Sequence, residues 1–250
     1  LKFIISQALN NTTAQINLNN LSGLPKETDV TMSIYNTQNN KLSYTYVHTL
    51  NRNQLPDTLS FDPIYQYKLV VHTVPEVTKE NIKLVPGKHN IIKVNTPQGK
   101  LNLKIQGTNS IFTGINCIIR KDSSHQTLNV QNMNTEKEYL VGTYDLEILS
   151  LPRIYFENIK IKQSEAVDIT IPMYGSIEVK KPEGPAALFV KKSGQNIWVY
   201  DFDDDRIIEN INLQPGKYMI SYRYERSSST AHTITKEFKI SSGENINIKL

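Results

Sequence analysis

The sequence predicts an all-β protein made of three tandem antiparallel β-sandwich domains. First, the stretch from Tyr67 to Val94 returns without a gap as Tyr144 to Ile171, each residue 77 positions further along. Second, apolar and polar residues alternate in almost every segment, which is the period of a half-buried strand. Third, turn residues recur about every 8–12 positions, as expected for antiparallel sandwiches. These three observations indicate copies of one small β unit.

The repeat also predicts where the domains begin and end. A third, looser copy covers Tyr218–Leu250 and carries five extra residues before its last two strands. The period places the domains at residues 1–96, 97–173 and 174–250, a size at which single domains fold. The equivalent positions are Tyr67 with Tyr144, Pro75 with Pro152, and Glu80–Lys83 with Glu157–Lys160.

In the first domain we expect alternating strands that end in a closing hairpin. Pro75 ends the strongest strand because proline has no N–H for the ladder, and the turn at Val85–Lys88 joins the last two strands. Leu1–Ala8 fits either the tail of a signal peptide or a first strand. The predicted strands cover residues 15–19, 30–35, 42–48, 65–74, 82–84 and 90–94.

The second and third domains follow the same plan, and each ends in the same predicted hairpin. Gly142 is expected to bend or bulge one long strand of the second domain. The second domain's strands are predicted at residues 101–105, 114–120, 126–131, 138–151, 159–161 and 167–171. Those of the third are predicted at 176–179, 188–191, 195–202, 207–213, 218–224, 238–240 and 246–248.

Composition narrows the classes of partner. The net charge is +4 and the lysines are scattered along alternating strands, as in Lys100–Lys104. Such lysines keep sheet faces and edges soluble, so we expect no nucleic-acid partner. No run of about 18 apolar residues is present, so we expect no membrane-spanning helix. Abundant Asn and Ile with scarce Ala are typical of an AT-rich bacterial genome.

Two segments resemble known families. Leu213–Tyr218 resembles the Leu-x-Pro-Gly-x-Tyr segment of transthyretin-like and carboxypeptidase-regulatory-like sandwiches, which share an immunoglobulin-like plan. Tyr67–Lys104 and Tyr144–Arg153 resemble the β-rich region that follows the von Willebrand factor A domain in Bacteroidota cell-envelope proteins. That domain's Asp-x-Ser-x-Ser motif is absent from the sequence. The resemblance implies a periplasmic or cell-surface location and another envelope protein as partner. One protein of this kind would be a periplasmic plug or accessory subunit of a type IX secretion machine.

No catalytic or metal-binding motif is recognisable. Cys117 is the only cysteine, which excludes an internal disulfide, and it shares a strand face with Ile115 and Ile119. We therefore interpret it as a core residue and not as a nucleophile. The histidines lack metal-ligand spacing, and a triad would have to be assembled in space. We expect no metal, no cofactor and no enzymatic activity. The five histidines are His48, His72, His89, His125 and His232.

One dense carboxylate cluster lies in the third domain. Neighbouring aspartates can supply oxygen ligands to Ca²⁺, but Arg206 stands where an EF-hand needs glycine and Asn212 where it needs glutamate. A solvated acidic loop, with Arg206 neutralising part of it, is the favoured interpretation. The aspartates are Asp201, Asp203, Asp204 and Asp205.

Aromatic residues beside this loop leave two interpretations open. Trp198 and Tyr200 alternate on one strand. Exposed rings beside carboxylates suit sugar binding, whereas a single Trp in a small sandwich suits the core, and we favour the core for Trp198. Tyr222 and Tyr224 fit either strand propensity or surface anchors for a partner.

The sequence thus predicts a non-enzymatic structural or protein-binding module of the bacterial cell envelope. It would act through sandwich faces and strand edges, to which a partner can add a strand. The alternatives are the secretion-machine subunit and a carbohydrate-binding array that uses Trp198, Tyr200 and the aspartate loop, with a glycan as ligand.

Overall fold

The computed structural model describes residues 12–111, 113–122, 124–224 and 232–250. These residues form an all-β structure in which six sheets make three repeated sandwich-like units. The segment Leu1–Ala8, expected to be a leader tail or a strand, lies outside the described residues. Within the described ranges, no helix has the length and apolar character needed to cross a bilayer.

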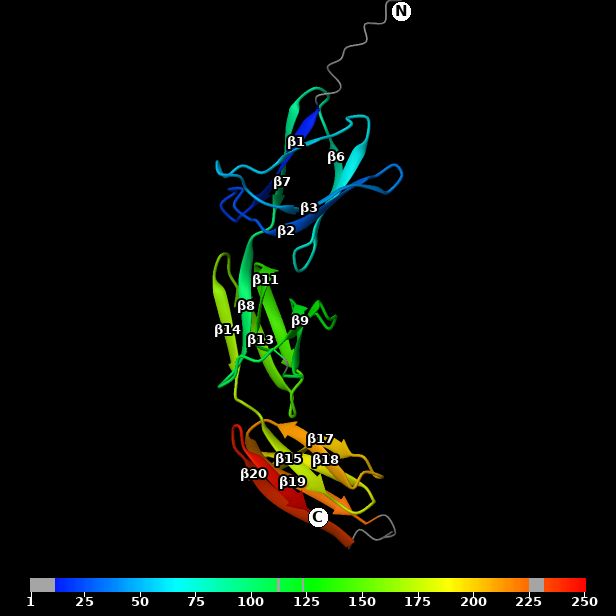
Figure 1. Cartoon of the computed structure of the whole chain (residues 1–250), viewed down its shortest axis with the longest axis vertical. Coiled ribbons are helices and arrows are strands. Elements are labelled where there is room, and N and C mark those ends of the chain that lie inside the picture. Colours follow the sequence, from blue (N-terminus) through cyan, green and yellow to red (C-terminus); the bar gives the residue numbers. More distant parts are fainter. Residues whose placement is uncertain (1–11, 112, 123, 225–231) are drawn as a thin grey trace, which may run out of the picture. The chain divides into compact units, whose positions relative to one another are not determined.

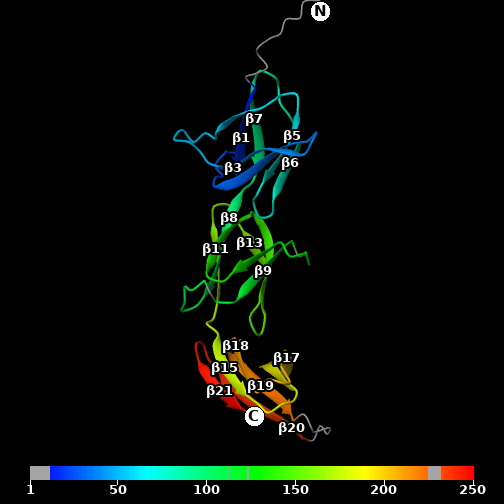
Figure 2. The same cartoon turned by 45° about the vertical axis from the view of Figure 1, so that its right-hand side comes forward.

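The first sandwich has a three-stranded sheet in the order β4-β1-β7 and a four-stranded sheet in the order β3-β2-β5-β6 (Figures 1 and 2). Its core is filled from both sheets, for example by Ile16 and Leu18 from one and Met32 and Leu69 from the other. The strands are β1 (Thr13–Asn19), β2 (Val30–Asn36), β3 (Lys41–His48), β4 (Thr58–Ser60), β5 (Gln66–Val71), β6 (Val77–Lys83) and β7 (His89–Asn95).

The second sandwich repeats this order, with sheets β11-β8-β14 and β10-β9-β12-β13. The long strand expected over residues 138–151 is two strands, β11 and β12, which belong to different sheets and are separated at Val141. The strands are β8 (Gln98–Ile105), β9 (Asn116–Lys121), β10 (Asn129–Asn132), β11 (Thr135–Leu140), β12 (Gly142–Ile148), β13 (Ile154–Ile161) and β14 (Ala166–Ile171).

The third sandwich has the same order again, with sheets β18-β15-β21 and β17-β16-β19-β20. Figure 1 shows β15 and β18 in one layer and β17, β19 and β20 in the other. The strands are β15 (Gly175–Lys180), β16 (Ala186–Lys192), β17 (Gln195–Phe202), β18 (Ile208–Leu213), β19 (Gly216–Arg223), β20 (Thr233–Ile240) and β21 (Asn245–Lys249).

The predicted closing hairpins are wrong in all three units. The last two strands of each unit belong to opposite sheets. β7 pairs in parallel with β1, and β21 pairs in parallel with β15. Alternation identifies a strand but not its partner, and the turns after β6 and β20 carry the chain from one sheet to the other. The antiparallel prediction holds for β16 with its neighbours β17 and β19, and for β2 with β3 and β5.

The repeated tyrosine has the same structural role in each copy. Tyr67, Tyr144 and Tyr218 are buried near the start of β5, β12 and β19. Their hydroxyls donate to the carbonyls of Asp62 (3.0 Å), Leu140 (2.7 Å) and Gln214 (2.6 Å), respectively. A buried tyrosine needs such a partner for its hydroxyl, and the bond fixes the loop that enters the strand. Burial raises the pKa of Tyr67 and of Tyr218.

The repeated Glu-Asn-Ile-Lys motif is explained by backbone conformation. Asn81 and Asn158 have φ of 56° and 59°, in the left-handed region that asparagine tolerates better than most residues. In the first copy, Glu80 and Asn81 together oppose Lys68, so the motif forms a β-bulge. The third copy lacks the motif, and its β19–β20 register is unbroken.

Candidate functional site

Strand β17 is an edge strand of the third sandwich, and its first and last residues are those predicted from the sequence. A register shift opposite Leu188 and Phe189 inserts Val199 as an extra residue. Val199 therefore takes a buried place, and Trp198 turns outward with 59% of its surface exposed. The favoured interpretation of Trp198 as a core residue is wrong, because the bulge reverses the alternation on which it depends.

The bulge also separates the two aromatic residues that were expected to share a face. The Trp198 Nε1 donates to Asp201 Oδ1 over 2.8 Å on the outer side. Tyr200 packs partly buried against the core, and its hydroxyl donates to Glu209 Oε2 over 3.0 Å. Burial first, and then Glu209, raises the pKa of Tyr200. Trp198 and Asp201 are thus brought together, whereas Tyr200 is not part of that surface.

The aspartate loop is held mainly through its backbone. Lys181 is almost fully buried, and its Nζ donates to the carbonyls of Gly184 (3.0 Å) and Asp204 (3.2 Å). Arg206 pairs with Asp203 at 3.1 Å, which confirms the expected partial neutralisation. Asp205 donates its N–H to Asp203 Oδ1. Among the described residues, no group of three or more His, Cys, Asp or Glu could hold a metal ion.

The two tyrosines considered as surface anchors differ in environment. Tyr222 is buried in the core of the third sandwich, so it cannot anchor a partner. Tyr224 follows the last residue of β19 and is exposed.

A groove of about 470 Å³ lies on the outer face of the four-stranded sheet of the third sandwich. Outward-facing residues of β16 and β19 alternate with the core residues Leu188, Ile220 and Tyr222. The groove combines small, aromatic and charged side chains. Residues that line it include Pro185, Ala187, Phe189, Asp201, Ser221 and Arg223.

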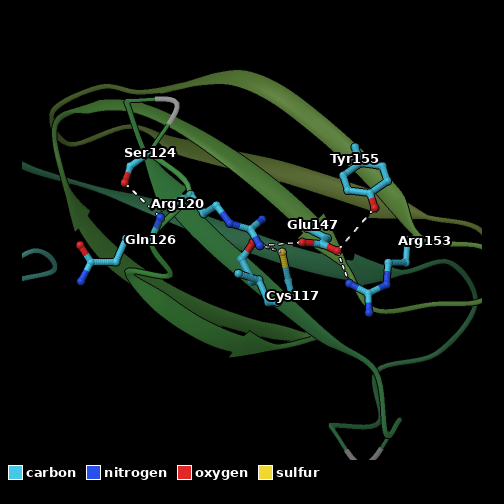
Figure 3. A network of polar contacts seen from close by, with 8 residues as sticks. Cys117, Arg120, Ser124, Gln126, Glu147, Arg153 and Tyr155 are labelled. Atoms are coloured by element: carbon cyan, nitrogen blue, oxygen red, sulfur yellow. Dashed lines mark hydrogen bonds and ion pairs between the residues drawn. The ribbon is translucent and has the colours of Figure 1, made fainter.

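A second polar site, not predicted from the sequence, lies on the four-stranded sheet of the second sandwich. Figure 3 shows Arg120 and Arg153 meeting the Glu147 carboxylate from different sides. Arg120 Nη2 lies 2.7 Å from Glu147 Oε2, and the Tyr155 hydroxyl lies 3.5 Å from Oε1. Only 8% of the Glu147 side chain is exposed, because the guanidinium groups cover it. Hydrogen bonds, the largest from Arg153, lower the pKa of Glu147.

This site resembles a structural ion pair more than a ligand site. A hollow of about 410 Å³ beside it is lined by Ser124, His125, Asp145 and Asn158, among others. Asp145 already accepts the backbone N–H of Asn158 at 2.8 Å. A carboxylate shielded from water must be paired, and the two arginines serve that purpose. No sequence spacing joins Arg120 to Glu147, since they come from different strands.

The first sandwich contains a hydrogen-bonded line of serine, histidine and glutamate. Ser33 Oγ lies 2.8 Å from His72 Nε2, and His72 Nδ1 lies 2.6 Å from Glu76 Oε1. This is the order of groups in a serine triad. However, Ser33 is only 5% exposed, is central in its sheet, and also bonds the Thr45 hydroxyl at 2.8 Å. The Ser33 hydroxyl is therefore shielded from solvent, whereas a catalytic nucleophile must be accessible to its substrate.

Two other titratable residues are core residues. Cys117 is fully buried, and burial raises its pKa to about 12, which confirms its interpretation as an apolar core residue. His48 is also fully buried, and neither ring nitrogen has a hydrogen-bond partner among the described residues.

Comparisons with known proteins give only distant structural similarity. No family model matches the chain, and no curated protein matches it. The Bacillus anthracis TIE protein is 10% identical with a TM-score of 0.26, over 96% of this chain and 50% of that protein. The pilus adhesin SpaC from Lactobacillus rhamnosus GG is 9% identical with a TM-score of 0.26, over 92% of this chain and 38% of the adhesin.

BcpA, the major pilin subunit of Bacillus cereus, is 11% identical with a TM-score of 0.23, over 96% of this chain and 97% of the pilin. The chain therefore spans about half or less of the first two proteins. The resemblance of the repeated stretch to Bacteroidota envelope proteins stays a prediction.

Proposed function

We propose that the chain is a non-enzymatic structural and protein-binding module of the bacterial cell envelope, and that β17 binds an extended segment of another envelope protein. This proposal depends on one observation, namely that β17 is an edge strand of the third sandwich. β17 is eight residues long and contains no lysine, arginine or proline. In the described part of the chain, β16 pairs with one side of β17 and no strand pairs with the other.

Natural edge strands are usually protected against pairing by lysine, proline, bulges or short length, and of these β17 has only the bulge at Val199. The opposite edge of the same sheet, β20, carries Lys236 and Lys239. β17 instead exposes Trp198 and Ile197, the latter at 45%. Unpaired backbone groups can hydrogen-bond an added strand, and these side chains can bury apolar area against it. The envelope location rests on the resemblance of the repeated stretch and is tested by fractionation of the cells that make the protein.

A lysine at the β17 edge tests the proposed contact. The tagged chain is incubated with envelope extract, and captured proteins are identified by mass spectrometry. Ile197→Lys is expected to lower capture of the specific partner by about tenfold, equivalent to roughly 1.4 kcal/mol. Ile234→Lys is the matched control, because Ile234 is exposed on the other edge of the sheet. Equal capture by both variants and the original chain would contradict binding at β17.

Carbohydrate binding by the third sandwich is a second candidate function. It is favoured by one observation, namely that Trp198 is exposed and its indole is held by Asp201. Rings held in this way can stack on sugar C–H faces while carboxylates accept sugar hydroxyls. Binding of a glycan panel to the immobilised chain tests it, and a uniformly negative panel would remove it.

A further inference from the structure

We propose that the groove on the outer face of β16, β17 and β19 is a single binding site for a neutral hexose oligosaccharide. One sugar ring stacks on Phe189 in the groove and on its cross-strand neighbour Trp198 beside the groove, and hydroxyls bind Asp201 and Arg223. This inference rests on carbohydrate binding as the second candidate function. The inference specifies the class of sugar. It also places the binding at one site in the third sandwich and not at an array of sites along the chain.

The strand register builds the groove from rows of outward-facing residues. Phe189 lines the groove. It pairs with Trp198 on one side and with Met219 on the other, which makes an apolar row across three strands whose outer members lie beside the lining. The next row places Ala187 between Asp201 and Ser221. A third row brings Arg223 beside Pro185, whose carbonyl accepts the Arg223 N–H.

The size of these side chains explains the hollow. Ala187 and Ser221 are small and form a low floor between the apolar row and the arginine row. Arg223 is four residues beyond Met219 on β19, so these rows are about 14 Å apart at roughly 3.4 Å per residue. The volume of about 470 Å³ lies within the range of small-molecule sites, about 300–1,000 Å³. An extended chain of sugar rings can lie across the floor.

The charges favour a neutral ligand. Asp201 and Asp204 contribute two carboxylates to the lining and Arg223 one guanidinium, so an acidic sugar would meet an excess of negative charge. Sugar hydroxyls both donate and accept, which suits carboxylate and guanidinium together. Arg223 forms no ion pair with another described residue. The bond from Trp198 to Asp201 fixes the ring, which lowers the entropy lost on binding.

Trp198 is the only tryptophan in the chain and lies beside Phe189, so its fluorescence reports on ligand bound at this end of the groove. The whole chain is titrated with maltotriose, cellotriose and mannotriose as neutral probes and with trigalacturonate as the acidic probe. We expect at least one neutral trisaccharide to shift the emission to the blue with saturation. Calorimetry with the same probe measures affinity independently of the reporter.

Two variants locate the binding. Ala187→Leu fills the floor, and Arg223→Ala removes the guanidinium; each is expected to weaken binding at least tenfold, about 1.4 kcal/mol. The controls are Ser176→Leu on the opposite sheet of the same sandwich and Lys239→Ala on β20, and both should bind as the original chain does.

The outcomes separate the two levels of the proposal. Saturable calorimetric binding that Ala187→Leu and Arg223→Ala leave unchanged would overturn the groove but keep carbohydrate binding. Binding of trigalacturonate alone would overturn the neutral ligand class. No binding of any probe to the folded chain would overturn the site and count against the carbohydrate function as well.

Discussion

Three tyrosine hydroxyls show how single residues hold each sandwich together. Tyr218 is almost fully buried, and its hydroxyl donates to the Gln214 carbonyl over 2.6 Å. Tyr218→Phe would leave that carbonyl without this donor, and we expect a loss of about 1–3 kcal/mol in the free energy of unfolding. Urea unfolding measures it, with Phe238→Leu, which changes the stacked neighbouring ring, as a comparison. Unchanged stability in Tyr218→Phe would contradict the role given to the repeated tyrosine.

His48 should make the first sandwich sensitive to acid. Burial lowers its pKa below the ordinary 6.5, although Asp57 and Asp29 act in the opposite direction. The unfolded chain then binds the proton more readily, so stability present above pH 6.5 is lost as the pH falls through the folded-state pKa. The loss is about 1.4 kcal/mol per pH unit within that window. His48→Leu should remove this part of the pH dependence, measured by urea unfolding between pH 7.5 and 5.

The exposed His89 provides the control for this prediction, because it has no buried ring to protonate. His89→Leu should keep the acid sensitivity of the original chain. If His48→Leu and the original chain lost stability in parallel, the buried neutral histidine would not be the cause.

The strand that contains Trp198 could be predicted from the sequence, but the face on which Trp198 lies could not. The sequence predicts the bounds of its strand, since Gln195–Phe202 is both the predicted and the observed range. Alternation then places Trp198, Tyr200 and Phe202 on one inward face. The bulge at Val199 reverses that phase between Tyr200 and Trp198, and nothing in the residues marks its position. The groove was unpredictable for the same reason, because it depends on the cross-strand register of Ala187 and Ser221.

At the scale of elements, the left-handed asparagines predict a selective response to substitution. Asn158 has φ of 59° and donates its N–H to Asp145 Oδ1. Asn158→Val places a β-branched residue there and should cost about 1–3 kcal/mol, whereas Asn158→Gly accepts the conformation. Thermal unfolding compares the two variants. Equal midpoints for the valine and glycine variants would contradict a requirement for positive φ at this position.

The existence of most strands was predictable, but the pairing of strands was not. Period two and turn residues locate the strands because they reflect local geometry. The choice between closing a hairpin after β6 and crossing to β1 depends on which sheet edge remains open, which is a property of the whole unit. The exact recurrence of Glu80–Lys83 as Glu157–Lys160 was the better guide, since it marks an asparagine with positive φ in both copies.

At the scale of the whole molecule, Ser33 offers the strictest test of the proposal that this is a non-enzymatic module. Its geometry toward His72 and Glu76 fits a triad, but the serine is shielded on a continuous sheet. We expect a fluorophosphonate probe to label the chain no more than it labels Ser33→Ala, as measured by intact-mass spectrometry. Stoichiometric labelling that disappears in Ser33→Ala and His72→Ala would show an activated nucleophile and contradict the proposal.

One sandwich plan occurs three times in this chain, and we propose that β17 is open for a partner strand. Amide hydrogen exchange of the whole chain, with and without the captured partner, measures both features at once. We expect three separate maxima of protection, at β2 and β5, β9 and β12, and β16 and β19, the central strands of the four-stranded sheets. We also expect rapid exchange at the open side of β17 that slows when the partner binds. A single protected core, or protection by the partner at another edge while β17 stays unchanged, would contradict these expectations.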